Sequence, residues 1–445
     1  MKTFAVVLAA AVAIALVWGV VAGSKPVPDR SSARATVADA AWYAALPVDP
    51  SAATAAFLAR VPADARARGD AFGRTRYVAL ALRVAVLIAS IALLMFTGAA
   101  TRMRSLGRRV SSSLPVQDAI VALLTLTAMF LLALPVETYA GFIRVRAGGF
   151  SRMTFSHWLH DAALQWAVTT VFYIVGIVVI YALIRRRPAS WTGFATAVYA
   201  ALTIIFVLLA PQYIEPLFNR ITPMADGPQK QAILSLARAN GVPADNVFVQ
   251  DASRQSALLN AHVSGFAGRA QIVLDDNTIA TTPQREVSMV MAHEIGHYVL
   301  AHVAKGIVFQ TLVTGIGFVF VGWTLKRLVE CFGRRWDVAG ISDVGALPLF
   351  WGLLMLWGFI ALPVSNTLIR EQETEADLYG LNASRQPLGL AEFMIRDADA
   401  RPLDVSSIEE TLFFDHPAAR NRIYTAMRWR AEHLTVPATE NDSRK

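Results

Sequence analysis

The pentapeptide His293-Glu294-Ile295-Gly296-His297 carries more structural information than any other part of this 445-residue sequence. On a helix, residues four apart lie on one face, so both imidazoles can reach one metal ion. An HExxH helix typically binds Zn²⁺ through its two histidines and uses the glutamate as a general base. The sequence therefore predicts a zinc site at His293 and His297, with Glu294 as the catalytic base.

A zinc site of this type needs a third protein ligand. A metzincin would have glycine at position 300 and histidine at position 303, but Leu300 and Val303 stand there, which excludes that subclass. The other common ligand is a carboxylate on a later helix, and the segment 370–377 offers three glutamates. We select Glu373 because it shares a helical face with two further charged residues, Arg370 and Asp377.

The neighbours of Glu373 on that face have predicted roles of their own. Asp377 is expected to orient a zinc-binding imidazole by accepting its second N–H. Arg370 is expected to pair with Glu373 or Asp377. Glu371 and Glu375 point elsewhere on the helix and are expected to be solvated.

The composition places this chemistry in a membrane. Apolar residues make up 55% of the chain and charged residues only 17%, which is too apolar for an ordinary soluble domain. The net charge of +8 does not indicate nucleic-acid binding, because arginine clusters such as 185–187 flank apolar runs, as they do beside membrane spans. The single cysteine, Cys331, excludes an intrachain disulfide and a cysteine-based metal site.

Seven apolar segments approach the length of about 20 residues that crosses a bilayer. They are Thr3–Ala22, Tyr77–Ala99, Val116–Val136, Ala162–Ile184, Trp191–Ala210, Ile307–Thr324 and Ala346–Leu368. The first is longer than the apolar core of a signal peptide, so we expect a retained span.

Four regions follow from these segments. Residues 1–211 form a membrane region with about five spans, and 23–76 within it is expected to be a loop. Residues 212–306 are a mixed catalytic subdomain, with a helix at Gln229–Asn240, strands at Val247–Gln250 and Gln271–Leu274, a turn at Ser264–Gly268 and a helix from Pro283. Two more spans occupy 307–369, and 370–445 is a polar helical tail.

Several motifs together resemble the type I CAAX prenyl proteases, which are multi-spanning zinc endopeptidases. They are Tyr213-Ile214-Glu215-Pro216-Leu217-Phe218-Asn219, Thr222-Pro223-Met224, Ser256–Phe266 with Asn260-Ala261, His293–His297 with His302, Glu373–Asp377, and Asp415-His416-Pro417. The resemblance runs from about Tyr213 to Tyr424. Upstream of that region the similarity lies in hydropathy rather than in motifs.

The resemblance implies more than spacing can. It implies a mainly α membrane protein, with about seven transmembrane helices around a water-filled chamber and a small α+β, gluzincin-like zinc-peptidase subdomain. Glu373 matches the third zinc ligand, His416 a histidine that stabilises the oxyanion, and Asn260 a residue of the substrate-binding edge strand. His302 is expected to pack rather than to bind metal, and Arg420 to pair with an acid near the site.

The resemblance also implies a function, namely cleavage near the C-terminus of membrane-associated proteins, among them prenylated CAAX proteins, with the active site facing the cytoplasm. We further expect the protein to act as a monomer and not to bind nucleic acid. Two alternatives remain. One is a membrane-protein quality-control protease of the HtpX type, whose members are much shorter. The other is a transporter or receptor with a structural, four-ligand metal site. The dense arginines in the loops opposite the site argue against the implied orientation.

Overall fold

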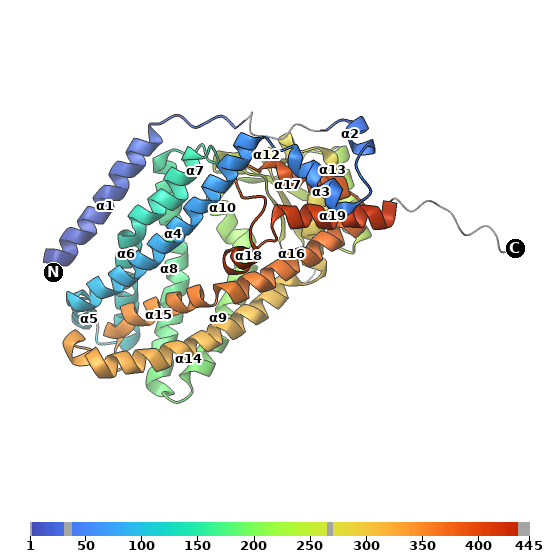
Figure 1. The fold of residues 1–445 in the computed structure, drawn as a ribbon. Coiled ribbons are helices and arrows are strands. Elements are labelled where there is room, and N and C mark those ends of the chain that lie inside the picture. The colour runs from blue at the N-terminus through green and yellow to red at the C-terminus, as the bar shows by residue number, and fades with distance from the viewer. Residues whose placement is uncertain (1, 31–37, 265–269, 435–445) are drawn as a thin grey trace.

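Long helices dominate the computed structural model, which describes residues 2–30, 38–264 and 270–434 (Figure 1). Within these ranges six helices are long and apolar enough to cross a membrane, and a bent pair makes a seventh. The six are α1 (Lys2–Gly23), α4 (Ala63–Phe96), α6 (Leu114–Glu137) with its extension to Ala147, α8 (Phe155–Arg186), α9 (Trp191–Leu209) with its extension to Phe218, and α14 (His302–Trp336). The predicted fold class is confirmed.

The bent pair consists of α15 (Leu347–Ile360) and α16 (Leu362–Ser384), which meet at 50°. The chain turns at Ala361, two residues before Pro363, which lies in the first turn of α16, where proline is tolerated because its missing N–H has no helical partner. As a result α15 stays within the bundle, whereas α16 leads out toward the catalytic part of the molecule (Figure 1).

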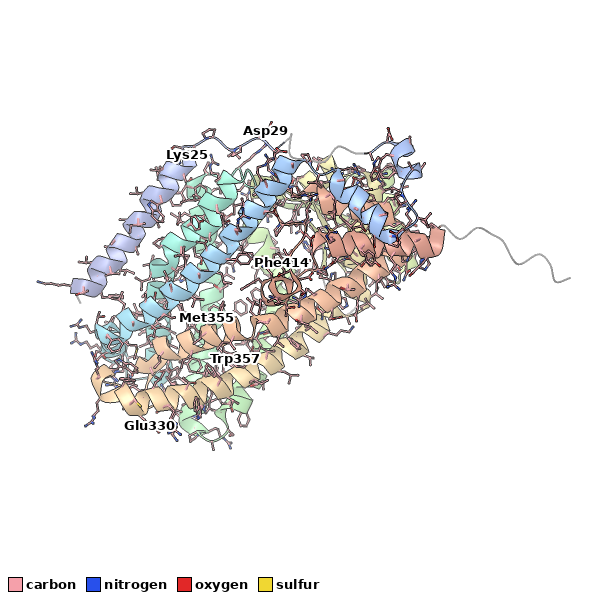
Figure 2. The ribbon with its side chains drawn as sticks, in the orientation of Figure 1. Lys25, Asp29, Glu330, Met355, Trp357 and Phe414 are labelled. Carbon is pink, nitrogen blue, oxygen red and sulfur yellow. The ribbon has the colours of Figure 1, made fainter. Side chains whose placement is uncertain are left out.

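Two apolar cavities lie among these helices. The first, of about 520 Å³, is lined by α4, α6, α8 and α15, and the second, of about 450 Å³, by α8, α9, α14 and α15. They share wall residues that include Tyr173, Trp351 and Met355. Figure 2 shows Met355 and Trp357 on α15 within the bundle. The bundle thus contains two cavities with mainly apolar walls.

Charged side chains inside the spans are paired. Asp118 of α6 is buried and accepts two hydrogen bonds of 2.6 Å each from Arg185 at the end of α8. Arg83 of α4 donates two to Glu137, at 2.8 and 2.7 Å. Pairing of this kind lowers the cost of placing an ionised group at membrane depth.

The catalytic subdomain contains a four-stranded sheet in the order β1-β2-β4-β3. β1 (Ile221–Pro223) runs antiparallel to β2 (Val247–Gln250), β2 runs parallel to β4 (Gln271–Asp275), and β4 runs antiparallel to β3 (Ala261–Ser264). Val247 and Leu274 are fully buried against α11 (Pro228–Ala239) and α13 (Gln284–Val299), so one face of the sheet closes a small core. β3 is an edge strand.

The expected helices and strands of this subdomain are therefore present, with ends shifted by at most a residue or two. α11 begins one residue before the expected Gln229, α13 begins directly after Pro283, and β2 has the expected bounds. The expected turn at Ser264–Gly268 lies outside the described residues, apart from Ser264, which ends β3.

The expected loop at 23–76 was wrong in its second half. After α2 (Ala40–Ala44), α3 (Pro50–Ala59) begins behind an Asp49 cap and α4 already starts at Ala63. Phe57 and Leu58 of α3 are buried against α17 (Pro387–Arg396) and α19 (Ala419–Leu434). Alanine-rich sequence with scattered charge looks loop-like, but alanine is the strongest helix former and this segment has an apolar partner to cover.

The predicted region boundaries at 211, 306 and 369 all fall inside helices. Residue 211 lies in the extension of α9, 306 lies in α14, and 369 lies in α16. The four predicted regions are therefore not separate structural units, because α14 and α16 each continue from the bundle into the catalytic part.

Candidate active site

The two histidines and the glutamate of the HExxH motif lie on α13, which packs across α16. Two glycines allow the close approach of the helices. A Cβ on Gly380 would lie 3.0 Å from the backbone nitrogen of His293, and one on Gly296 would lie 3.1 Å from Tyr379. With no side chain at either crossing point, α16 brings Glu373 to the two imidazoles.

The three predicted ligands converge. Nε2 of His293 lies 3.1 Å from Nε2 of His297 and 3.2 Å from Oε2 of Glu373, and Nε2 of His297 lies 3.4 Å from Oε1 of Glu373. Donors about 2.0–2.1 Å from one tetrahedral ion would be about 3.3 Å apart. One ligand atom from each residue lies within 4.8 Å of the other two, so the group can hold one metal ion.

The donor chemistry also fits a cation. Oε2 of Glu373 is buried and accepts no hydrogen bond from any described residue. Burial would lower the pKa of His293, but the neighbouring carboxylates of Asp377 and Glu373 outweigh it and raise the pKa to about 9. The surroundings of this imidazole thus favour a positive charge, and a divalent ion supplies one without a proton on the ring.

Each ligand histidine is held through its second ring nitrogen. Nδ1 of His293 lies 2.9 Å from Oδ1 of the buried Asp377, as predicted. Nδ1 of His297 lies 2.8 Å from Nδ1 of His302, whose Nε2 lies 3.0 Å from Glu375. Contacts of this kind fix the orientation and tautomer of metal-binding imidazoles. His302 therefore packs against the site, as expected. Glu375 is half-exposed, as expected for a solvated residue, but it also contacts His302.

Asp377 is in turn fixed by Arg422, a residue that the sequence reasoning missed. Arg422 of α19 donates from Nε to Oδ2 at 2.7 Å and from Nη2 to Oδ1 at 2.6 Å, and both partners are buried. Arg420 had been expected to pair with an acid near the site, but it pairs with the exposed Asp404 instead. Nothing in the sequence favours position 422 over 420 until α19 is placed against α16.

The predicted pairing of Arg370 with Glu373 or Asp377 was wrong. Its guanidinium donates to the backbone oxygens of Glu410 and Phe414, at 2.8 and 2.5 Å, and to Thr367. Arg370 thus anchors the end of α18 (Ser407–Phe413) and the residue just before Asp415-His416. Figure 2 shows Phe414 beside α16 and α18, between the bundle and the catalytic part.

A cavity of about 380 Å³ joins the predicted residues. Its walls include the metal-binding group, Glu294, Asn260, His262, Arg401 and His416. Nε2 of the half-exposed His416 lies 3.3 Å from Oε1 of Glu373. Burial raises the pKa of Glu294, and the two histidines oppose this only in part. A raised pKa suits a carboxylate that must take up a proton near neutrality.

Asn260 lies directly before the edge strand β3. Its backbone is held by Thr278, whose hydroxyl both accepts from the Asn260 N–H at 2.9 Å and donates to the Asn260 oxygen at 2.8 Å. Asn260 therefore borders the cavity from the end of a strand whose outer edge pairs with no described strand.

Comparisons with known proteins agree with this geometry. The model of peptidase family M48 matches residues 224–430, and that of the CAAX prenyl protease N-terminal region, with five membrane helices, matches residues 66–220. Together they cover most of the chain and meet at the start of the catalytic subdomain. The chain is a membrane metalloprotease, and it belongs to peptidase family M48, in the branch that carries the CAAX prenyl protease N-terminal region.

Individual relatives point the same way. The chain is 31% identical to an uncharacterized metalloprotease, YhfN, of Bacillus subtilis over 52% of this chain and 54% of that protein, so the match spans about half of that relative's length. It is 26% identical to CAAX prenyl protease 1 of Saccharomyces cerevisiae over 66% of this chain and 68% of that one. The crystal structure of S. mikatae Ste24p has the same fold, with a TM-score of 0.68, 18% identity and coverage of 95% and 99%.

Proposed function

We propose that the chain is a zinc metalloendopeptidase in which His293, His297 and Glu373 bind the metal and Glu294 is the catalytic base. The observation that carries the proposal is the convergence of two imidazole nitrogens and the Glu373 carboxylate, with separations of 3.1–3.4 Å that are close to those around one tetrahedral ion. Two nitrogens and a carboxylate oxygen suit Zn²⁺ and leave one coordination position for water or substrate.

The residues around the metal-binding group have different roles in peptide hydrolysis. When bound, zinc supplies Lewis acidity to the scissile carbonyl and makes water more acidic. Glu294 takes the proton of the attacking water and passes it to the leaving amine, for which its raised pKa is suited. His416 borders the cavity beside Glu373 and donates a hydrogen bond to the developing oxyanion.

Substrate enters as an extended segment beside β3. The free edge of that strand offers backbone groups for β-augmentation, and the side-chain amide of Asn260 lies where it can hold a peptide backbone. Asp377 and Arg370 act indirectly, the first by orienting His293 and the second by anchoring the segment before His416.

The test compares metal content and cleavage of a reporter peptide in the wild type and in Glu294→Gln. Because Glu294 is not a ligand, we expect the variant to retain zinc and lose turnover. Glu371→Gln, which changes an exposed glutamate two residues from a ligand, is the matched control. Retained turnover in Glu294→Gln overturns the assignment of the base, and His297→Gln should lose metal and activity together.

The substrates we propose are membrane-associated proteins cleaved near their C-termini, among them prenylated CAAX proteins. Several relatives are named CAAX prenyl proteases, and two apolar cavities adjoin the start of α16, which carries Glu373. Comparing cleavage of prenylated and unmodified versions of one peptide tests this. Equal rates would favour the alternative, a quality-control protease of the HtpX type.

A structural metal site in a transporter or receptor would be closed by a fourth protein ligand. His302 or another residue would have to supply that ligand, but Nδ1 of His302 faces Nδ1 of His297, on the far side of that ring from Nε2. The open position and family membership favour an enzyme. We propose that a monomer is active and that nucleic acid takes no part.

We propose that the active site faces the cytoplasm, as the resemblance implies. The opposite end of the bundle argues for the reverse, because segments 97–113, 185–190 and 325–345 carry eleven basic and three acidic residues. Figure 2 places Glu330 at that end, far from Phe414. A reporter fused after Lys445 decides the orientation, and a signal from outside the cytoplasm overturns the proposal.

A further inference from the structure

Arg401 is a cation in the wall of the catalytic cavity. It follows α17 in the chain and contributes to the same cavity as Glu294 and His416. Its Nε is buried without a hydrogen-bond partner, and within the described ranges its guanidinium forms no ion pair. Guanidinium groups bordering a cavity are costly to leave unpaired, because both their charge and their donors lose water.

The acids around Arg401 are committed to other cations. Asp397 and Asp399 both bind Arg30, at 2.9 and 2.6 Å, and Asp377 is held by Arg422. Burial lowers the pKa of Arg401, as does the nearby Arg422, against an opposing contribution from Asp397. The structure thus leaves this guanidinium free for an anion that arrives with the substrate.

The backbone that carries Arg401 is fixed by the first turns of α4. A Cβ on Gly69 would lie 2.1 Å from the carbonyl oxygen of Ala398 and 2.6 Å from that of Arg401, and one on Gly73 would lie 2.8 Å from Pro402. Two glycines four residues apart let α4 lie directly on this segment. The backbone at Arg401 is therefore held in place by its packing against α4.

We propose that Arg401 binds the C-terminal carboxylate of the substrate and so sets the distance between the chain end and the cleaved bond. The planar guanidinium matches a carboxylate in a bidentate geometry, which a lysine cannot reproduce. The inference rests on the proposed function, since it assigns one end of the substrate within the same cavity. It gives a physical reason for an endopeptidase to act near C-termini.

The experiment uses the full-length enzyme and two forms of one peptide, with a free C-terminal carboxylate or a C-terminal amide. For the wild type we expect kcat/KM to be about 30-fold higher for the acid, the size of a charge-assisted hydrogen-bonded contact. In Arg401→Gln that preference should disappear, mainly through a lower kcat/KM for the acid. Arg401→Lys should retain only part of it.

Arg420→Gln is the matched control, because Arg420 is an exposed arginine paired with Asp404 outside the cavity. Mass spectrometry of the products supplies a second readout. When the peptide is lengthened, the wild type should cut at a constant distance from the new C-terminus, whereas Arg401→Gln should cut at several bonds. Equal cleavage of acid and amide by the wild type overturns the role of Arg401 alone, whereas absence of cleavage with zinc bound overturns the proposed function.

Discussion

Replacing Asp377 with asparagine tests how the metal site is supported. The carboxylate accepts three hydrogen bonds of 2.6–2.9 Å, one from His293 and two from Arg422, and all three residues are buried. An asparagine of the same shape removes the charge and leaves the guanidinium of Arg422 only its longer, 4.0 Å contact with Glu373. Breaking a buried pair in this way costs about 3–5 kcal/mol, and loss of a hydrogen bond to a metal-binding imidazole weakens metal affinity about 10–100-fold.

The two effects can be separated with a second variant. Asp377→Asn combined with Arg422→Met removes the guanidinium as well and should recover much of the stability, while zinc affinity stays low. Thermal unfolding in detergent gives the first quantity, and competition with a chromogenic chelator gives the second. Wild-type zinc affinity in Asp377→Asn would refute the role given to this carboxylate, and Glu371→Gln serves as the control on the same helix.

Three further outcomes follow from the same geometry. Gly380→Ala places a Cβ 3.0 Å from the His293 backbone, so it should lower the free energy of unfolding by about 1–3 kcal/mol and weaken metal binding. Unfolding and zinc titration measure the two effects, and unchanged stability and zinc affinity would contradict the close helix crossing. Because burial raises the pKa of Glu294, acidification should reduce kcat with a midpoint above pH 4.5, the ordinary pKa of a glutamate. A kcat that stays constant down to pH 4.5 would argue against Glu294 as the base. Chelation should abolish activity and lower the melting temperature, both restored by Zn²⁺, and an unchanged melting temperature would show that the folded chain holds no tightly bound ion.

Local periodicity accounts for what the sequence could predict. His293 and His297 lie one turn apart, and Glu373 and Asp377 lie one turn apart, so helix geometry alone places each pair on a common face. Apolar length likewise located the spans, because a bilayer imposes nearly the same length on every helix that crosses it.

The remaining contacts depend on packing between distant segments. Arg422 reaches Asp377 from another helix, and Arg401 borders the cavity because α4 clamps its backbone at Gly69. Arg370 shares a face with Glu373, yet nearby backbone oxygens from α18 and the residue after it take its donors instead. In each case the partner lies tens of residues away and carries no spacing signal.

X-ray absorption at the zinc edge on the purified protein measures the central arrangement most directly. The account predicts two imidazole nitrogens and one carboxylate oxygen at about 2.0–2.2 Å with one additional water oxygen, and loss of the carboxylate contribution in Glu373→Ala. A shell of four protein ligands, or a spectrum unchanged in Glu373→Ala, would contradict it.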